Sequence, residues 1–99
     1  MAIFYIIYSE QIDKYYSGIT TEDIQLRLLK HNESRYGSKY TSITNDWILK
    51  CEIVGIDFAH VRRMEIYVKK RKSRSYILDL ISNTNTRQKL FESTKFKSL

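Results

Sequence analysis

Near its N-terminus the chain runs Ile3-Phe4-Tyr5-Ile6-Ile7-Tyr8. Every residue of this stretch is β-branched or aromatic, and both types are enriched in β-strands. A strand with one solvated face alternates apolar and polar residues, whereas an unbroken apolar run indicates burial on both faces. We therefore expect residues 3–8 to form a strand that other elements cover on both sides.

The segments that follow predict a β-hairpin. Residues 9–13 are mostly polar and predict a turn, and residues 14–19 predict a second strand. Alternation groups side chains on one face of each strand: Ile3, Tyr5 and Ile7 on the first, Tyr16 and Gly18 on the second. A glycine inside a strand often marks the close approach of another backbone or of a ligand, which makes Gly18 a candidate contact residue.

Helices and one more strand account for the rest of the chain. Thr20 to Asp23 have the spacing of a helix N-cap with acidic residues in the first turn. Ser73 has the side chain of an N-cap for a later helix. We expect a helix over about 22–33, a loop over 34–46, a strand over 47–54, and helices over about 58–70 and 73–82. Residues 83–99 form either a last helix or a loose basic tail.

Composition limits the chain to one small domain and favours a polyanionic partner. Ninety-nine residues, 42% of them hydrophobic, can build one core, and a second independent core would be too small to be stable. The formal net charge is +6, with cations concentrated at Lys69, Lys70, Arg71, Lys72 and Arg74. Such clustering favours a phosphate-bearing partner, although the default for a basic helix end is a solvated surface that the helix dipole stabilises.

Two features of the sequence bear on the cellular compartment. Cys51 is the only cysteine, so an internal disulfide and a cysteine-based zinc site are excluded. The longest N-terminal apolar stretch, residues 3–8, is too short for a signal peptide or a membrane span. We therefore expect a cytoplasmic protein that does not associate with membranes.

Glu65 is the most informative polar residue of the predicted helices. At about 100° per residue, it projects into an apolar stripe formed by Phe58, Val61, Met64 and Val68. A carboxylate in such a stripe destabilises the fold by several kcal/mol unless it is paired or binds a metal. A salt bridge to Arg62 or Lys69 on the same helix is the structural alternative, and both interpretations stay open.

Arg27 and His31 are four residues apart, so they lie on the same side of the first predicted helix. Both sit at the edge of the arc that holds Ile24 and Leu28, rather than on the solvated face. On this pattern alone, a snorkelling arginine beside a hydrogen-bonded histidine is the favoured interpretation. Strand tyrosines are likewise usually packing residues, and the chain has eight tyrosines.

Taken in order, these residues resemble the GIY-YIG nuclease domain over residues 3–81. The two name-giving motifs appear as Ile3-Phe4-Tyr5 and Tyr16-Ser17-Gly18, followed in the family's order by Arg27, His31-Asn32 and Glu65. Ile3 and Ser17 depart from the usual motifs, and the segment between Tyr16 and Arg27 is one residue longer than is typical. Further stretches are similar to short stand-alone bacterial members: Lys39-Tyr40-Thr41, Asn45-Asp46-Trp47 and Lys72-Ser73-Arg74.

The resemblance implies an α/β fold in which a small three-stranded antiparallel sheet is flanked by helices. It also implies hydrolysis of a DNA phosphodiester bond with one divalent metal ion, Mg²⁺ or Mn²⁺, held by Glu65. Arg27 would bind the non-bridging oxygens, because its planar fork suits phosphate. Tyr5 would activate water with His31 as proton relay, and Tyr16 would orient water or phosphate, the two tyrosine roles being exchangeable.

DNA, whether single-stranded, duplex or branched, is the expected partner of residues 1–82, which we take as the nuclease domain. The candidate DNA-binding residues are Gly18, Lys39, Tyr40, Thr41, Lys69, Lys70, Lys72 and Arg74. One alternative is a nucleic-acid-binding module without catalysis. Another is a nuclease that needs a protein partner for targeting, with Phe91 and Phe96 as exposed docking residues.

Overall fold

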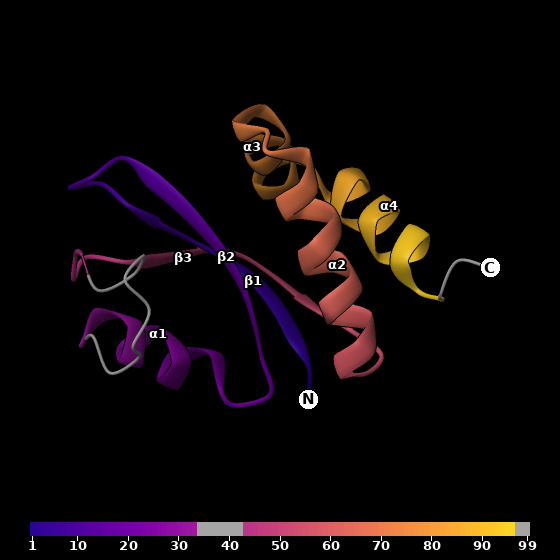
Figure 1. Cartoon of the computed structure of the whole chain (residues 1–99), viewed down its shortest axis with the longest axis horizontal. Coiled ribbons are helices and arrows are strands. Elements are labelled where there is room, and N and C mark those ends of the chain that lie inside the picture. The colour runs from indigo at the N-terminus through magenta and orange to yellow at the C-terminus, as the bar shows by residue number, and fades with distance from the viewer. Residues whose placement is uncertain (34–42, 97–99) are drawn as a thin grey trace.

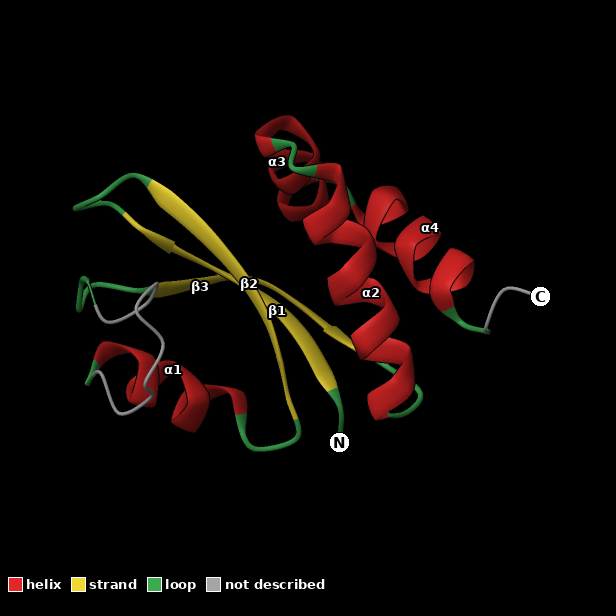
Figure 2. Ribbon diagram, viewed as in Figure 1, coloured by secondary structure: helices red, strands yellow, loops and turns green. Residues whose placement is uncertain are grey.

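The computed structural model describes residues 1–33 and 43–96. Its strands, β1 (Ile3–Ser9), β2 (Lys14–Thr20) and β3 (Ile48–Val54), pair antiparallel in the order β2-β1-β3. Its helices are α1 (Ile24–Asn32), α2 (Phe58–Arg71), α3 (Arg74–Ser82) and α4 (Thr84–Thr94). Figure 1 and Figure 2 show α1 on one side of the sheet and the other three helices on the opposite side. The predicted three-stranded antiparallel sheet flanked by helices is confirmed.

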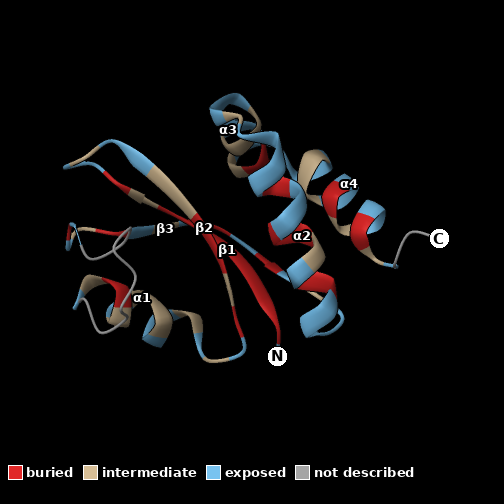
Figure 3. Ribbon diagram, in the orientation of Figure 1, coloured by how far each residue is buried: buried red, intermediate tan, exposed pale blue. Residues whose placement is uncertain are grey.

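β1 is the central strand, and nearly all of its residues are buried, as its unbroken apolar sequence predicts. In Figure 3 its ribbon is coloured as buried along most of its length. Phe4 and Ile6 face the layer of α2, α3 and α4, whereas Ile3, Tyr5 and Ile7 pack on the side of α1. Of these three α1-side residues, Tyr5 is the one that carries a hydroxyl group.

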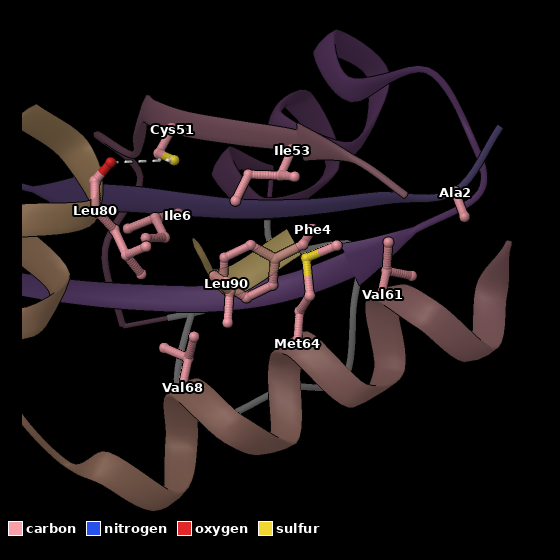
Figure 4. Packing of buried hydrophobic residues seen from close by; sticks show 10 residues of the cluster. All are labelled: Ala2, Phe4, Ile6, Cys51, Ile53, Val61, Met64, Val68, Leu80 and Leu90. Carbon is pink, nitrogen blue, oxygen red and sulfur yellow. Dashed lines mark hydrogen bonds between the residues drawn. The ribbon is translucent and has the colours of Figure 1, made fainter. Parts of the chain in front are cut away.

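The larger core lies between the sheet and helices α2 to α4. Its fully buried centre joins β1 with all three helices through Phe4, Ile6, Met64, Leu80 and Leu90 (Figure 4). Burying a side chain of this size stabilises a fold by roughly 1.5–3 kcal/mol. Residues 84–94 form a helix, and because its Leu90 is buried in this core, the helix is part of the same domain.

The buried face of α2 differs from the prediction at its N-terminal end. Phe58 is 53% exposed and does not belong to the buried stripe, and His60 is buried instead. His60 Nδ1 accepts the N–H of Ile56 at 3.0 Å, so its Nε2 donates to the Phe91 carbonyl, also at 3.0 Å. The Phe91 ring meets that of His60 edge-on and packs against the core, contrary to the expected exposure, whereas Phe96 is 76% exposed.

α1 begins later than predicted. Its N-cap is Asp23, whose carboxylate accepts the N–H groups of Gln25 at 2.9 Å and Leu26 at 3.1 Å. No acidic residue lies in the first turn, and Thr20 instead accepts the N–H of Glu22 in the turn before the helix. A carboxylate that satisfies two unpaired N–H groups is an effective helix start, which explains the shift.

The other elements end within a residue or two of their predicted limits. β3 begins at Ile48, one residue later than expected. α3 follows the predicted N-cap Ser73, whose hydroxyl accepts the N–H of Tyr76 at 3.2 Å. Within the part of the chain that the structure describes, no helix is long and apolar enough to cross a membrane.

Candidate active site

Tyr5 lies on the α1 side of the sheet and is almost completely buried, with 1% of its surface exposed. It is paired with Gly18 across the β1–β2 ladder. A Cβ atom at position 18 would lie 2.6 Å from the Tyr5 hydroxyl oxygen, far inside contact distance. The close approach expected at Gly18 is therefore made by the side chain of Tyr5, for which the glycine leaves room. A DNA contact at Gly18 stays a prediction.

The Tyr5 hydroxyl joins two side chains of α1. Its oxygen lies 2.7 Å from Nε2 of His31 and 3.2 Å from Nε of Arg27. Because a guanidinium can only donate, the tyrosine oxygen accepts from Arg27 and its own proton is available to His31. When the hydroxyl donates to Nε2, a neutral His31 carries its proton on Nδ1. The four-residue spacing on α1 brings both side chains to the same hydroxyl.

His31 is 2% exposed. Burial, together with the nearby positive charge of Arg27, lowers the pKa of His31 from 6.5 to about 4. The imidazole is therefore neutral at physiological pH and can accept a proton. The guanidinium on one side of the hydroxyl stabilises a phenolate, whereas the lowered pKa makes the His31 imidazole on the other side a weak proton acceptor in the free protein.

Tyr16 extends this cluster toward the edge of the sheet. Its ring meets that of His31 edge-on, with centroids 5.6 Å apart, and lies 6.5 Å from the ring of Trp47. The backbone of Trp47 is held by Asn32, whose side-chain amide donates to the Trp47 carbonyl at 2.9 Å and accepts its N–H at 2.6 Å. The end of α1 thus fixes both His31 and the aromatic wall beside Tyr16.

Glu65 lies on α2, on the opposite side of the sheet, and is 7% exposed. Arg62 Nη1 lies 2.6 Å from its Oε1, and Lys69 Nζ lies 3.3 Å from its Oε2. The ion pairs named as the structural alternative are therefore both present. Because both cationic side chains are largely exposed, a metal ion could still compete with them for the carboxylate oxygens.

Lys69 connects Glu65 with the tyrosine cluster. Its Nζ also lies over the ring of Tyr16, 5.4 Å from the ring centroid, within the range of a cation–π contact. α2 thereby reaches past the edge strand β2 to residues held on the other face. The structure brings four predicted catalytic residues into one contact network: Tyr5, Tyr16, Arg27 and His31. Glu65 joins this network through Lys69.

A family model described as the GIY-YIG catalytic domain matches residues 1–77. The chain belongs to the GIY-YIG family. The matched segment contains the whole sheet, α1, α2 and the start of α3, and with them the complete contact network. Neither the curated proteins nor the solved structures include a significant match to the chain. Since GIY-YIG domains form a nuclease family, the resemblance seen in the sequence is confirmed at the level of the family.

The donor set of this GIY-YIG domain fits a sparse metal site. Within residues 1–33 and 43–96, no three His, Cys, Asp or Glu side chains gather where they could hold one ion. A single carboxylate can still hold Mg²⁺ or Mn²⁺ when water and substrate phosphate supply the other oxygens. Glu65 is fixed on a helix, and the cations on its two oxygens are more than half exposed and can be displaced, so it fits as the one protein ligand.

The candidate DNA-binding residues of the GIY-YIG domain lie in different places. One stretch falls outside the described residues: Lys39, Tyr40 and Thr41. Three residues line hollows beside β2: Lys69, Lys72 and Arg74. Lys70 is exposed on α2 but lines neither of these hollows.

Two tertiary contacts of the site were not predicted from the sequence. Asn32 and Trp47 belong to stretches that resemble the family, yet no local pattern indicates that one holds the backbone of the other. The contact of Lys69 with Tyr16 also joins residues far apart in the sequence. For Asn32 and Trp47, the available signal is that both stretches belong to the GIY-YIG resemblance, whereas no such signal marks Lys69.

Proposed function

We propose that this chain is an endonuclease that hydrolyses DNA phosphodiester bonds with one divalent metal ion, Mg²⁺ or Mn²⁺. The observation that carries the proposal is the Tyr5 hydroxyl, which lies within hydrogen-bond distance of a neutral imidazole and a guanidinium. Membership of a nuclease family supports the same interpretation.

Tyr5 is proposed to remove a proton from the attacking water. A tyrosine with a pKa of about 10 is a poor base at neutral pH unless nearby positive charge stabilises the phenolate. Arg27 supplies such charge at 3.2 Å, and His31 can take up the hydroxyl proton at 2.7 Å. The phenolate oxygen then accepts a proton from water as the water oxygen attacks phosphorus. The bond from phosphorus to the leaving oxygen breaks, and that oxygen takes a proton from solvent.

Arg27 is proposed to bind the non-bridging oxygens of the scissile phosphate. Its guanidinium is partly exposed and pairs with Glu22 at 3.9 Å, and its several N–H donors allow it to bind a phosphate as well. Burial is the larger cause of the lowered pKa of His31 and the charge of Arg27 the smaller one, and a phosphate bound here would offset the effect of Arg27. Substrate binding would therefore make His31 a better proton acceptor.

Glu65 is proposed to hold the metal ion. When bound, this ion would supply positive charge that stabilises the charge developing on the phosphate and on the leaving oxygen. Glu65 would release its contacts with Arg62 and Lys69 in exchange. The ammonium of Lys69 would then remain beside Tyr16 and face the DNA backbone.

Tyr16 is proposed to orient the water or the phosphate. It is more exposed than Tyr5 and contacts both His31 and Lys69, so it lies between the two sides of the site. Its greater exposure also makes it the alternative base. Comparing Tyr5→Phe with Tyr16→Phe under single-turnover conditions separates the two roles, because the variant that lacks the base has the lower rate of the chemical step.

Cleavage assays test the proposed activity. The chain is incubated with supercoiled plasmid and with labelled single-stranded, duplex and branched oligonucleotides, in Mg²⁺, in Mn²⁺ or in EDTA. We expect cleavage that requires metal and is lost in Glu65→Gln. No cleavage of any substrate by the parent chain, or equal cleavage by Glu65→Gln, would overturn the proposal.

A nucleic-acid-binding module without catalysis is the second candidate. One observation favours it: both oxygens of Glu65 carry cationic partners, so its charge is balanced without a metal. This candidate predicts DNA binding that weakens steeply with salt and equal affinities for the parent and Glu65→Gln, with no cleavage by either. Dependence on a protein partner is a further prediction, for which Phe96 offers an exposed ring.

A further inference from the structure

A groove runs along the outer edge of the sheet beside β2. One pocket of about 230 Å³ lies between β2 and the α2–α3 junction, and a second of about 450 Å³ lies beside Tyr16. Both are lined by Tyr15, Ser17 and Lys72, so they form one continuous feature. We call it the β2 groove and define it by Lys14, Tyr15, Ser17, Lys69, Lys72 and Arg74.

The β2 groove is strongly basic. Its walls carry four cationic side chains, Lys14, Lys69, Lys72 and Arg74, and no acidic side chain lines either described pocket. Two acids touch these cations from outside, since Asp13 pairs with Arg74 at 2.7 Å and Glu65 pairs with Lys69. An excess of two positive charges remains, and such an excess in a narrow groove favours a polyanion.

Lys72 adopts an unusual backbone conformation at this place. It ends α2 with φ 48° and ψ 38°, in the left-handed region that a glycine adopts more easily. A lysine therefore occupies a position where glycine would fit the backbone better. Non-glycine residues in this region are enriched at functional sites, so Lys72 is a candidate contact residue.

The walls of the groove are fixed by contacts across it. The ring centroids of Tyr15 and Tyr8 lie 4.5 Å apart, and the guanidinium of Arg74 lies 5.1 Å from the Tyr15 ring centroid. Arg74 also donates to the carboxylate and the carbonyl of Asp13. These contacts tie the β1–β2 turn to the start of α3 and hold the cations of both walls in place.

The groove leads directly into the proposed active site. Lys69 and Tyr16 line its inner end, and Lys69 also contacts Glu65. Lys72 lines the same pocket as Lys69 and Tyr16, so the cations of the groove continue up to the proposed active site.

We propose that the β2 groove binds the phosphodiester backbone of the cleaved DNA strand on one side of the scissile bond. Lys14, Lys72 and Arg74 contact successive phosphates beyond the one bound at the active site. The inference rests on the proposed nuclease function, because that function places a DNA strand at Tyr16 and Lys69. It adds a binding surface on β2 that the catalytic network does not include.

Binding is measured in the Glu65→Gln background, so that the DNA stays intact. Lys14→Ala is combined with Lys72→Gly, because glycine suits the backbone at position 72. The matched control is Lys50→Ala with Lys89→Ala, which removes two exposed lysines from β3 and α4. Fluorescence anisotropy with labelled single-stranded and duplex oligonucleotides is recorded over a range of salt concentrations, and circular dichroism verifies the fold of each variant.

We expect the groove variant to bind at least one of these oligonucleotides about tenfold to a hundredfold more weakly than the control. The slope of log K against log salt should fall by about 1.4 to 1.8, the value for two lost phosphate contacts. Equal affinities and slopes for groove variant and control overturn the groove proposal, whether or not the parent cleaves DNA. A folded parent that binds no oligonucleotide overturns it too. If the groove variant binds more weakly than the control but the parent cleaves no substrate, the nuclease function is refuted and the groove still stands as a DNA-binding surface.

Discussion

The hydroxyl of Tyr5 lies 2.7 Å from Nε2 of His31. This contact joins the central strand to α1 and sets a buried, neutral imidazole against a buried hydroxyl. Arg27 approaches the same oxygen from one helical turn away. The chemistry that we propose depends on this arrangement, and most of the predictions below alter one of its members.

Replacing Tyr5 with phenylalanine should remove the base and keep the buried ring. We expect single-turnover cleavage to slow by about 10²- to 10⁴-fold, the usual contribution of a positioned acid or base, with DNA affinity changed little. Tyr8→Phe is the matched control, since it removes another β1 hydroxyl, one that donates to Asp13 away from the network. Cleavage by Tyr5→Phe at the rate of the control would show that the Tyr5 hydroxyl is not needed.

Gly18→Ala should disturb Tyr5 directly. The added methyl group would lie 2.6 Å from the hydroxyl and 2.7 Å from Cζ of a ring packed inside the domain, so the ring has to shift. Overpacking of this kind destabilises by about 1–3 kcal/mol, and the shift should also slow cleavage. Urea unfolding measures the first effect. Unchanged stability and activity would mean that Tyr5 does not need the space above Gly18.

Stability should fall as the pH drops from about 6.5 to 4 because of His31. The unfolded chain takes up a proton on this side chain near pH 6.5, whereas the folded protein keeps it neutral down to about pH 4. Protons therefore bind the unfolded state more readily in this window, and acidification favours unfolding by at most about 3 kcal/mol.

Urea unfolding of the parent and of His31→Gln at several pH values checks this effect. The parent should lose stability through the window, and the variant should lose clearly less. Asp46 does not interfere. Hydrogen bonds from Ser9 and Thr44 lower its pKa to about 2, so its own effect on the free energy of unfolding occurs only at pH values below about 4. Parallel pH profiles for parent and variant would contradict the burial of a neutral His31.

Lys69→Met should strengthen the binding of Mn²⁺ at Glu65. The ammonium competes with a metal for Oε2, so its removal should lower the Kd for Mn²⁺ several-fold and raise the gain in Tm at a given metal concentration. Electron paramagnetic resonance of free Mn²⁺ gives the Kd, and Lys70→Met is the control. If Lys69→Met and Lys70→Met bind Mn²⁺ equally, the metal does not share the Glu65 oxygens with Lys69.

Local sequence patterns predicted most of the secondary structure. The unbroken run of apolar residues in β1, the N-cap at Ser73 and the helical spacing of Glu65 with Arg62 and Lys69 all depend on near neighbours in the sequence. Such interactions can be inferred without knowing the fold.

What the sequence did not predict depends on tertiary contacts. The burial of His60 follows from the position of α4, whose Phe91 packs against the histidine. The contact of Lys69 with Tyr16 exists because α2 lies beside the edge strand β2. The roles of the two tyrosines were suggested by family resemblance alone, and their geometry now supports different tasks for the buried Tyr5 and the more exposed Tyr16.

The most direct test of the proposed nuclease activity is single-turnover cleavage of a labelled DNA substrate, with and without Mg²⁺ or Mn²⁺. It compares the parent with Arg27→Ala, Glu65→Gln and the control Arg71→Ala. Arg71 is an exposed arginine at the end of α2, where it packs on Tyr76, so its loss should leave the rate close to that of the parent. We expect metal-dependent cleavage by the parent and the control, and a loss of at least about 100-fold in the other two variants. Cleavage by Arg27→Ala and Glu65→Gln at the parent rate, or none by the parent with either metal, would contradict it.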